Sequence, residues 1–177
     1  MYTLEKILTL ADIDQLINVY KQMKPELAHQ DYNLFDVDKR HITSEYRNIA
    51  PLVKLDEYAK LDNFSHYFLE YGVDGFTRFH TDDDDRVGLT IVTLLEEVDL
   101  IGGETLIQLP YEKRERPSNK YAKRQGKDEA PLNQRIIPRL VRSEVGDSMI
   151  YDKSLMHGVA QVEQGTRLVL VSWYKVK

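Results

Sequence analysis

The chain has no cysteine, and this absence removes several kinds of chemistry at once. Disulfide bonds, thiolate metal ligands and cysteine nucleophiles are all excluded. The chain also lacks an apolar run of membrane-spanning length. Its N-terminal segment carries Glu5, Lys6, Asp12 and Asp14, where a signal peptide needs an unbroken apolar stretch. We therefore expect a cytoplasmic protein with no membrane partner.

An excess of positive charge is missing as well. The 24 lysine and arginine residues face 29 acidic ones, which leaves a net charge of −5. Because nucleic-acid binding depends largely on neutralising phosphates, this balance gives no general reason to expect a nucleic-acid partner. The composition, with 42% hydrophobic and 30% charged residues over 177 positions, is typical of a single folded domain spanning 1–177.

The N-terminal part of the chain predicts one clear helix, over residues 10–23. Apolar residues recur there at helical spacing, Thr9 and Asp12 resemble an N-cap with its acidic partner, and Pro25 follows the end. Residues 26–65 have a mixed pattern that favours short helices and loops. We expect residues 1–65 to support the main core.

After residue 65 the sequence changes to short segments rich in β-branched and aromatic residues, separated by Gly, Asp or Pro. About eight such strands without helices between them favour a mainly β sandwich or barrel over residues 66–177. The segments are HYFLEYG, GFTRFHTD, GLTIVTLLEE, ETLIQL, RLVRS, SMIYD, LMHGVAQV and TRLVLVSWYKV.

A charged insertion at 110–139 interrupts these strands. It holds four prolines, and nine basic residues against four acidic ones give it a charge of +5, whereas the rest of the chain is at −10. Segments of this length between strands are uncommon. Two interpretations stay open: a solvated insertion, or a lid that grips substrate.

His80 and Asp82 begin the stretch HTDDDDR, where four consecutive aspartates would repel one another unless solvated or close to a cation. In a strand, residues i and i+2 point to the same face, so these two side chains can reach one point. Of the five histidines, only His157 lies in a late apolar strand that could pair beside them. Two imidazoles and one carboxylate form the ligand set of non-haem Fe(II) sites.

Arg167 adds to this pattern. Strand alternation puts Arg167, Val169, Val171 and Trp173 on one face and Leu168 on the other. A guanidinium on an apolar face is costly unless it meets an anion. That anion can be a carboxylate of the protein itself or the distal carboxylate of a bound dicarboxylic acid.

Three stretches together carry a family resemblance: YGVDGFTRFHTD from residue 71, RVGLTIVTLLEEVDLIGGET from 86, and EVGDSMIYDKSLMHGVAQVEQGTRLVLVSWY from 144. Their order and spacing resemble the 2-oxoglutarate and Fe(II)-dependent dioxygenases of the prolyl 4-hydroxylase-like group. The resemblance implies a double-stranded β-helix, or jelly roll, with N-terminal supporting helices. It also implies His80, Asp82 and His157 as iron ligands and Arg167 as the residue that binds the 5-carboxylate of 2-oxoglutarate.

The same resemblance implies an enzyme that uses Fe(II), 2-oxoglutarate and O₂ to hydroxylate an unactivated C–H bond, with ascorbate as a further expected cofactor. Prolyl residues of a peptide or protein are the first expected substrate, and a free amino acid or small metabolite is the second. Tyr71 matches a tyrosine that faces the co-substrate. Trp173 matches an aromatic residue beside the iron, although ordinary core packing explains it equally well.

The sequence departs from the family pattern at several positions. Leu94 stands where relatives often carry a tyrosine that hydrogen-bonds the 5-carboxylate, which makes Thr90, on the same strand face, a candidate replacement. Trp173 stands where the nucleic-acid repair branch has a second arginine, which further disfavours a nucleic-acid substrate. A rival interpretation keeps the β-fold without catalysis, as a small-molecule-binding sandwich with structural histidines.

Overall fold

The computed structural model describes residues 1–23, 27–32, 35–82, 84–108 and 138–176, with the backbone alone for 27–32. Most of the insertion at 110–139 therefore lies outside the described residues. No helix within the described ranges is long and apolar enough to cross a membrane.

Helix α1 (Leu10–Gln22) follows the prediction closely. Its N-cap is Thr9, whose hydroxyl accepts from the Asp12 amide while the Asp12 carboxylate accepts from the Thr9 amide at 2.8 Å. This reciprocal pair satisfies two backbone donors that a helix start leaves open. Lys54 of helix α2 (Ala50–Ala59) places its ammonium 2.7 Å from the same carboxylate. Asp12 thus stabilises the start of α1 and also joins the two helices.

The strands form one antiparallel sheet of eleven strands within the described chain. The ten on its main path run in the order β1-β9-β6-β11-β4-β3-β5-β10-β7-β8, and β2 pairs with β3. Their bounds are β1 Tyr2–Glu5, β2 Leu27–Tyr32, β3 Phe35–His41, β4 Asn63–Tyr71, β5 Phe76–His80, β6 Val87–Gly102, β7 Thr105–Gln108, β8 Arg139–Val141, β9 Ser148–Asp152, β10 Met156–Val159 and β11 Val162–Lys175.

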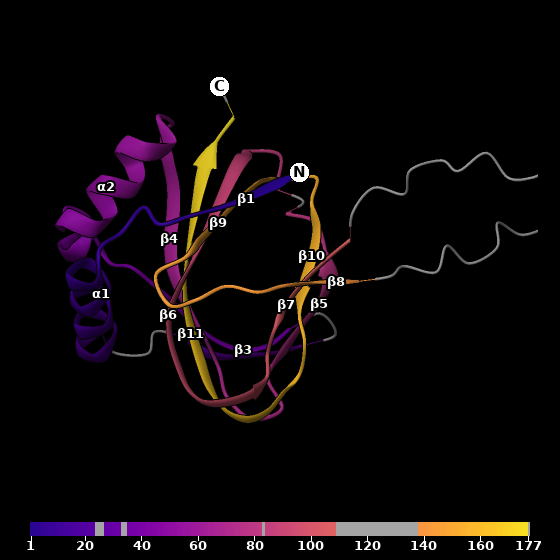
Figure 1. Cartoon of the computed structure of the whole chain (residues 1–177). Coiled ribbons are helices and arrows are strands. Elements are labelled where there is room, and N and C mark those ends of the chain that lie inside the picture. Colours follow the sequence, from indigo (N-terminus) through magenta and orange to yellow (C-terminus); the bar gives the residue numbers. More distant parts are fainter. Residues whose placement is uncertain (24–26, 33–34, 83, 109–137, 177) are drawn as a thin grey trace, which may run out of the picture.

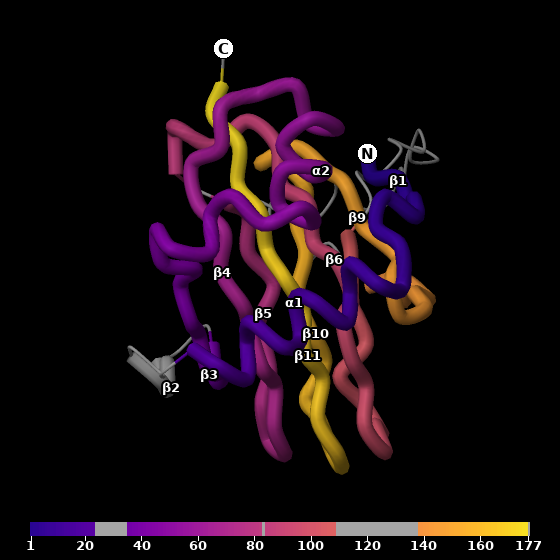
Figure 2. The backbone as a smooth tube through the Cα atoms, turned by 90° about the vertical axis from the view of Figure 1, so that its left-hand side faces the viewer, coloured from indigo at the N-terminus to yellow at the C-terminus, as the bar shows by residue number. Residues whose placement is uncertain are grey.

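The sheet curls so that β5, β10 and β7 lie opposite β4, β11 and β6, and both helices cover the outside of the second group (Figure 1). Figure 2 shows α1 and α2 lying across these strands. Leu168 and Leu170 of β11 pack into the core beneath the helices, whereas Val169 and Val171 point to the inside of the curl. The predicted mainly β fold of the jelly-roll type, with supporting N-terminal helices, is confirmed.

The region 26–65 contains more strand than its sequence indicated. Besides a 3₁₀ turn (Ser44–Tyr46) and α2, it supplies β2 and β3, and β3 pairs with both β4 and β5. The eight strands predicted after residue 65 are all present as β4 to β11.

Gly102 ends β6 with a φ of +76°, which favours glycine. A side chain there would begin 2.3 Å from the Gln161 carbonyl oxygen. The glycine pair at 102–103 therefore serves the turn into β7.

We expect Asp12→Ala to destabilise the fold by about 1–2 kcal/mol, because it removes the capping box and leaves Lys54 without its carboxylate. Asp14→Ala, an exposed change in the same helix, is the matched control. Hydrogen bonds from Lys54 and Thr9 outweigh the effect of burial and hold the Asp12 pKa below its ordinary value of 3.8. The stabilisation should therefore be complete above pH 3.8 and fade as pH falls towards the folded-state pKa. Urea unfolding between pH 3 and 7 measures both effects; equal stability of the two variants would contradict this role.

Candidate metal centre and co-substrate pocket

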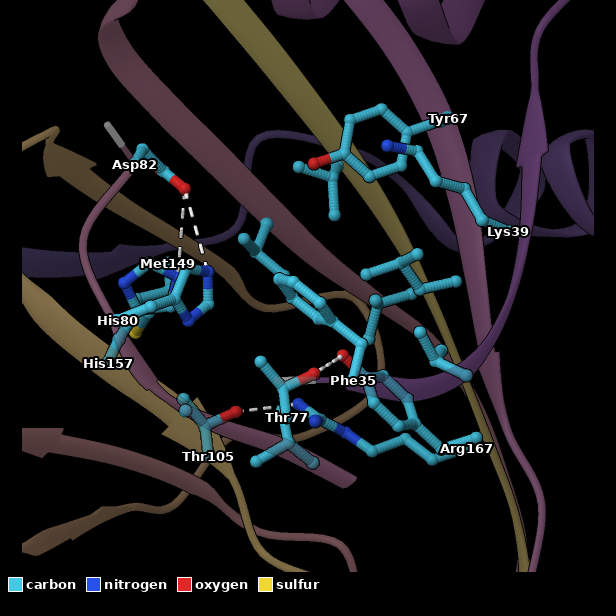
Figure 3. Close-up of a pocket in the computed structure, with 18 of the residues that line it drawn as sticks. Phe35, Lys39, Tyr67, Thr77, His80, Asp82, Thr105, Met149, His157 and Arg167 are labelled. Carbon is cyan, nitrogen blue, oxygen red and sulfur yellow. Dashed lines mark hydrogen bonds and ion pairs between the residues drawn. The ribbon is translucent and has the colours of Figure 1, made fainter. Parts of the chain in front are cut away.

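The inside of the curl encloses a cavity of about 340 Å³. Its walls come from the inward faces of β3 to β7 and β9 to β11, so residues far apart in the sequence meet there (Figure 3). Most of the lining is apolar, with a few polar groups, which is typical of a small-molecule site.

His80 and His157 meet because β10 pairs with β5 in a register that sets them directly opposite each other. Their ring centroids are 4.4 Å apart. Asp82 follows β5, and its Oδ1 lies 3.9 Å from Nε2 of His80 and 4.0 Å from Nε2 of His157. One ligand atom from each of the three residues lies within 4.8 Å of the others. The three predicted ligands therefore converge on one point.

The backbone sets the tautomer of both rings. Nδ1 of His80 lies 3.0 Å from the carbonyl oxygen of Arg78, and Nδ1 of His157 lies 2.9 Å from that of Leu155. Since a carbonyl oxygen only accepts, each Nδ1 carries the proton and each Nε2 has a lone pair directed at the common point. Burial, and also the proximity of His80, lowers the pKa of His157, which favours the neutral, ligating form.

Thr90 fixes the third ligand. Its hydroxyl donates to Oδ2 of Asp82 at 2.6 Å, and both residues are buried. This leaves Oδ1 facing the two imidazoles. The contact places Thr90 beside the three predicted ligands, and its suggested role at the 5-carboxylate stays a prediction.

These donors suit a divalent cation. Two neutral imidazole nitrogens and one carboxylate oxygen, each held from behind by a hydrogen bond, form the facial set that binds non-haem Fe(II). A cation at this point would offset the buried charge of Asp82.

One phenol contacts the triad, and a second lies in the same cavity. The Tyr151 hydroxyl donates to Nε2 of His157 at 3.0 Å. Burial, and secondarily the charge of Asp82, raises the pKa of both Tyr151 and Tyr67 well above its ordinary value. Both residues therefore present neutral hydroxyl groups to the cavity that holds the triad.

Arg167 lies in the same cavity, where it is 4% exposed. Its guanidinium donates to the Thr105 hydroxyl at 2.7 Å and lies 5.9 Å from the Tyr71 ring. Burial lowers its pKa, with Tyr71, Glu97 and Glu104 acting in the opposite direction. No carboxylate within ion-pair distance of Arg167 is found among the described residues, so its fork can accept an anionic ligand.

The other predicted pocket residues also line the cavity. Tyr71, whose pKa burial raises, is hydrogen-bonded to Thr77 at 3.0 Å near Arg167. Trp173 contributes to the cavity wall and also contacts Tyr67 edge-on, at a centroid distance of 5.3 Å. Leu94 is buried on the inward-facing core without lining the cavity.

Sequence reasoning missed Lys39, Tyr67, Thr105 and Tyr151, which also line the cavity. Alternation along an assigned strand could have found Tyr67, Thr105 and Tyr151, since each lies two or four positions from another inward-facing residue. Lys39 lies on β3, which the sequence did not indicate.

The remaining described aspartates of the acidic run have their own partners. Asp84 receives two side-chain hydrogen bonds from Arg86, which lower its pKa to about 2, and Asp85 lies 3.2 Å from Lys153. Among the described members of the run, Asp82 alone faces the cavity.

Comparisons with solved structures support this assignment at the level of the fold. A prolyl-4-hydroxylase from Pseudomonas putida superposes with a TM-score of 0.67 at 16% identity, covering 99% of this chain and 92% of its own. A viral collagen prolyl hydroxylase from Paramecium Bursaria Chlorella virus-1, in complex with 2-oxoglutarate, gives 0.66 at 13%, with 99% and 96% covered. HygX from Streptomyces hygroscopicus, with nickel, 2-oxoglutarate and hygromycin B bound, gives 0.66 at 11%, with 98% and 82% covered.

No protein-family model and no curated protein sequence matches the chain. Over nearly its whole length, however, the chain has the fold of the 2-oxoglutarate and Fe(II)-dependent oxygenases, notably the prolyl 4-hydroxylases, and it carries a His-x-Asp…His triad. The resemblance inferred from the motifs is thus confirmed in structure.

We expect Thr90→Val to weaken divalent metal binding by about 10- to 100-fold, because the Asp82 carboxylate loses the group that orients it. Thr93→Val is the matched control: Thr93 is equally buried and its hydroxyl is hydrogen-bonded to Ser148 at 2.8 Å, but it points to the other face of β6. Competitive titration with Zn(II) or Co(II) measures the affinity. An equal loss of metal affinity in both variants would mean that Thr90 contributes only to the stability of the fold.

Proposed function

We propose that this protein is a 2-oxoglutarate- and Fe(II)-dependent oxygenase. The observation that carries the proposal is the convergence of His80, Asp82 and His157, with both Nε2 lone pairs directed inward, in one cavity with the buried Arg167. A binding protein with structural histidines would have no need for three ligand-type atoms to face one point.

Arg167 and the triad divide the binding of the co-substrate between them. A dicarboxylate needs a cation for its distal carboxylate, and the Arg167 guanidinium, steadied by Thr105, provides one. His80, Asp82 and His157 would hold the iron in the same cavity. Apolar side chains of Val92, Val169 and Val171 line the same cavity.

When bound, the iron supplies the oxidising chemistry: 2-oxoglutarate, O₂ and a substrate C–H become succinate, CO₂ and C–OH. The chain's own residues hold and orient the reactants. Thr90 keeps one Asp82 oxygen turned to the metal point, and the two backbone carbonyls keep both imidazoles in the ligating tautomer. This division of labour is usual for cofactor enzymes.

The proposed substrate class begins with prolyl residues of a peptide or protein, supported by the fold shared with the two prolyl hydroxylases. A small molecule is the second candidate, supported by the structure of HygX with hygromycin B bound. Gain of one oxygen by mass, measured on proline-containing peptides and on a panel of free amino acids, separates these candidates.

We expect Asp82→Ala to abolish iron-dependent succinate formation, with a loss larger than the roughly 10- to 100-fold that removal of an outer hydrogen-bond partner causes. Asp84→Ala, an equivalent change two residues away that faces Arg86, should leave turnover unchanged. A coupled succinate assay across the substrate panel measures both. Unchanged turnover in Asp82→Ala would falsify the ligand assignment.

Arg167→Met should raise the KM for 2-oxoglutarate by at least about 30-fold, because truncating one member of a buried charge pair costs about 2–5 kcal/mol. Arg167→Lys should recover part of this loss, and the exposed Arg47→Met is the control. A normal KM for 2-oxoglutarate in Arg167→Met would place the co-substrate elsewhere.

A further inference from the structure

A second cation faces the cavity from β3. Phe35, Val37 and Lys39 lie on the inward face of this strand at alternate positions, and all three line the cavity. Lys39 is paired in register with Leu69 of β4, which also lines it. Its side chain therefore shares the space that holds the triad and Arg167.

The ammonium of Lys39 has aromatic neighbours in place of a counter-charge. Its Nζ lies 4.0 Å from the centroid of the Tyr67 ring and 5.7 Å from that of Trp173. No carboxylate pairs with it among the described residues. Burial lowers the pKa of Lys39. Lys39 is half-buried, and contact with aromatic rings returns only part of the cost of taking its charge partly out of water, so an anion bound there would stabilise it.

Tyr67 adds a hydrogen-bond donor at the same place. Its ring lies beneath the Lys39 ammonium, and its neutral hydroxyl has no hydrogen-bond partner among the described residues. An ammonium and a phenol together match the acceptor oxygens of a carboxylate.

Lys39 lies apart from Arg167, the residue proposed to bind the co-substrate. Figure 3 shows Lys39 and Tyr67 together at one side of the cavity, apart both from the triad and from Arg167. A co-substrate held by Arg167 and by iron at the triad leaves the Lys39 side of the cavity for the substrate. With about 340 Å³ in all, that space suits a small group.

We propose that Lys39, with Tyr67, binds a carboxylate of the substrate, so that the substrate class is a carboxylic acid oxidised a few bonds from its carboxylate. This inference rests on the proposed function and narrows it. A free amino acid, another small acid, or the C-terminal residue of a peptide carries such a group. An internal prolyl residue does not, because its carboxyl group forms a peptide bond.

The test measures binding without turnover. Protein loaded with redox-inert Zn(II) and 2-oxoglutarate is titrated, by calorimetry and ligand-observed NMR, with the twenty amino acids, with four- to six-carbon dicarboxylic acids, and with the primary amide of each. Proline-ending peptides with free or amidated C-termini, and peptides with internal proline and blocked ends, complete the panel. They distinguish small acids from peptide ends.

The wild-type protein should bind at least one acid about 10- to 100-fold more tightly than its amide, the range expected for a hydrogen bond between charged groups. Lys39→Met should abolish this preference, Lys39→Arg should retain part of it, and the exposed Lys21→Met should retain all of it. The affinity for 2-oxoglutarate should be the same in all four proteins. Thermal unfolding verifies that each variant is folded.

Three results would overturn the inference: no acid preferred over its amide, a preference that survives in Lys39→Met, or weaker 2-oxoglutarate binding in that variant, which would make Lys39 a co-substrate anchor. Failure of Zn(II) to bind at the triad would instead contradict the proposed function. The acid preference can then still be measured on the metal-free protein, so the two failures are distinguishable.

Discussion

The antiparallel pairing of β10 with β5 is the constraint on which the site depends. It sets His157 opposite His80, although 77 positions separate them in the chain. Because side chains alternate between the faces of a strand, a slip of one residue would turn His157 out of the cavity. The pairing of β10 with β7 on its other side, over four residues, holds that register. The opposed position of the two imidazoles is therefore a property of the sheet.

Few charged side chains face the cavity, and each of them has a definite position. The acidic run that follows β5 keeps Asp82 inside, hydrogen-bonded to Thr90, while Asp84 and Asp85 pair with cations at the surface. The interior cations, Arg167 and Lys39, come from different strands and lie apart. In a cavity with largely apolar walls, such isolated charges strongly affect which ligand binds.

Much of this structure could be predicted from the sequence, because strand alternation carries the information. It assigned Arg167 and Trp173 to the inward face and brought His80 and Asp82 together, while the family resemblance added His157 as the third expected ligand. It could not show that the Thr90 hydroxyl bonds Asp82, since alternation tells which face a side chain takes but not which neighbour it meets. Strand β3 escaped detection because Lys39 occupies an inward position where an apolar residue would have completed the pattern. Residues 110–137 lie outside the described part of the chain, so the prediction made for them from their composition stays a prediction.

The two faces of strand β11 have different roles. Leu168 and Leu170 on one face pack beneath the helices, while Val169 and Val171 on the other border the cavity. Neighbouring residues of one strand therefore serve folding and the shape of the cavity separately. Exchanging a valine should change the outline of the cavity while the helices stay docked, which makes β11 a suitable strand for redesigning what the cavity accepts.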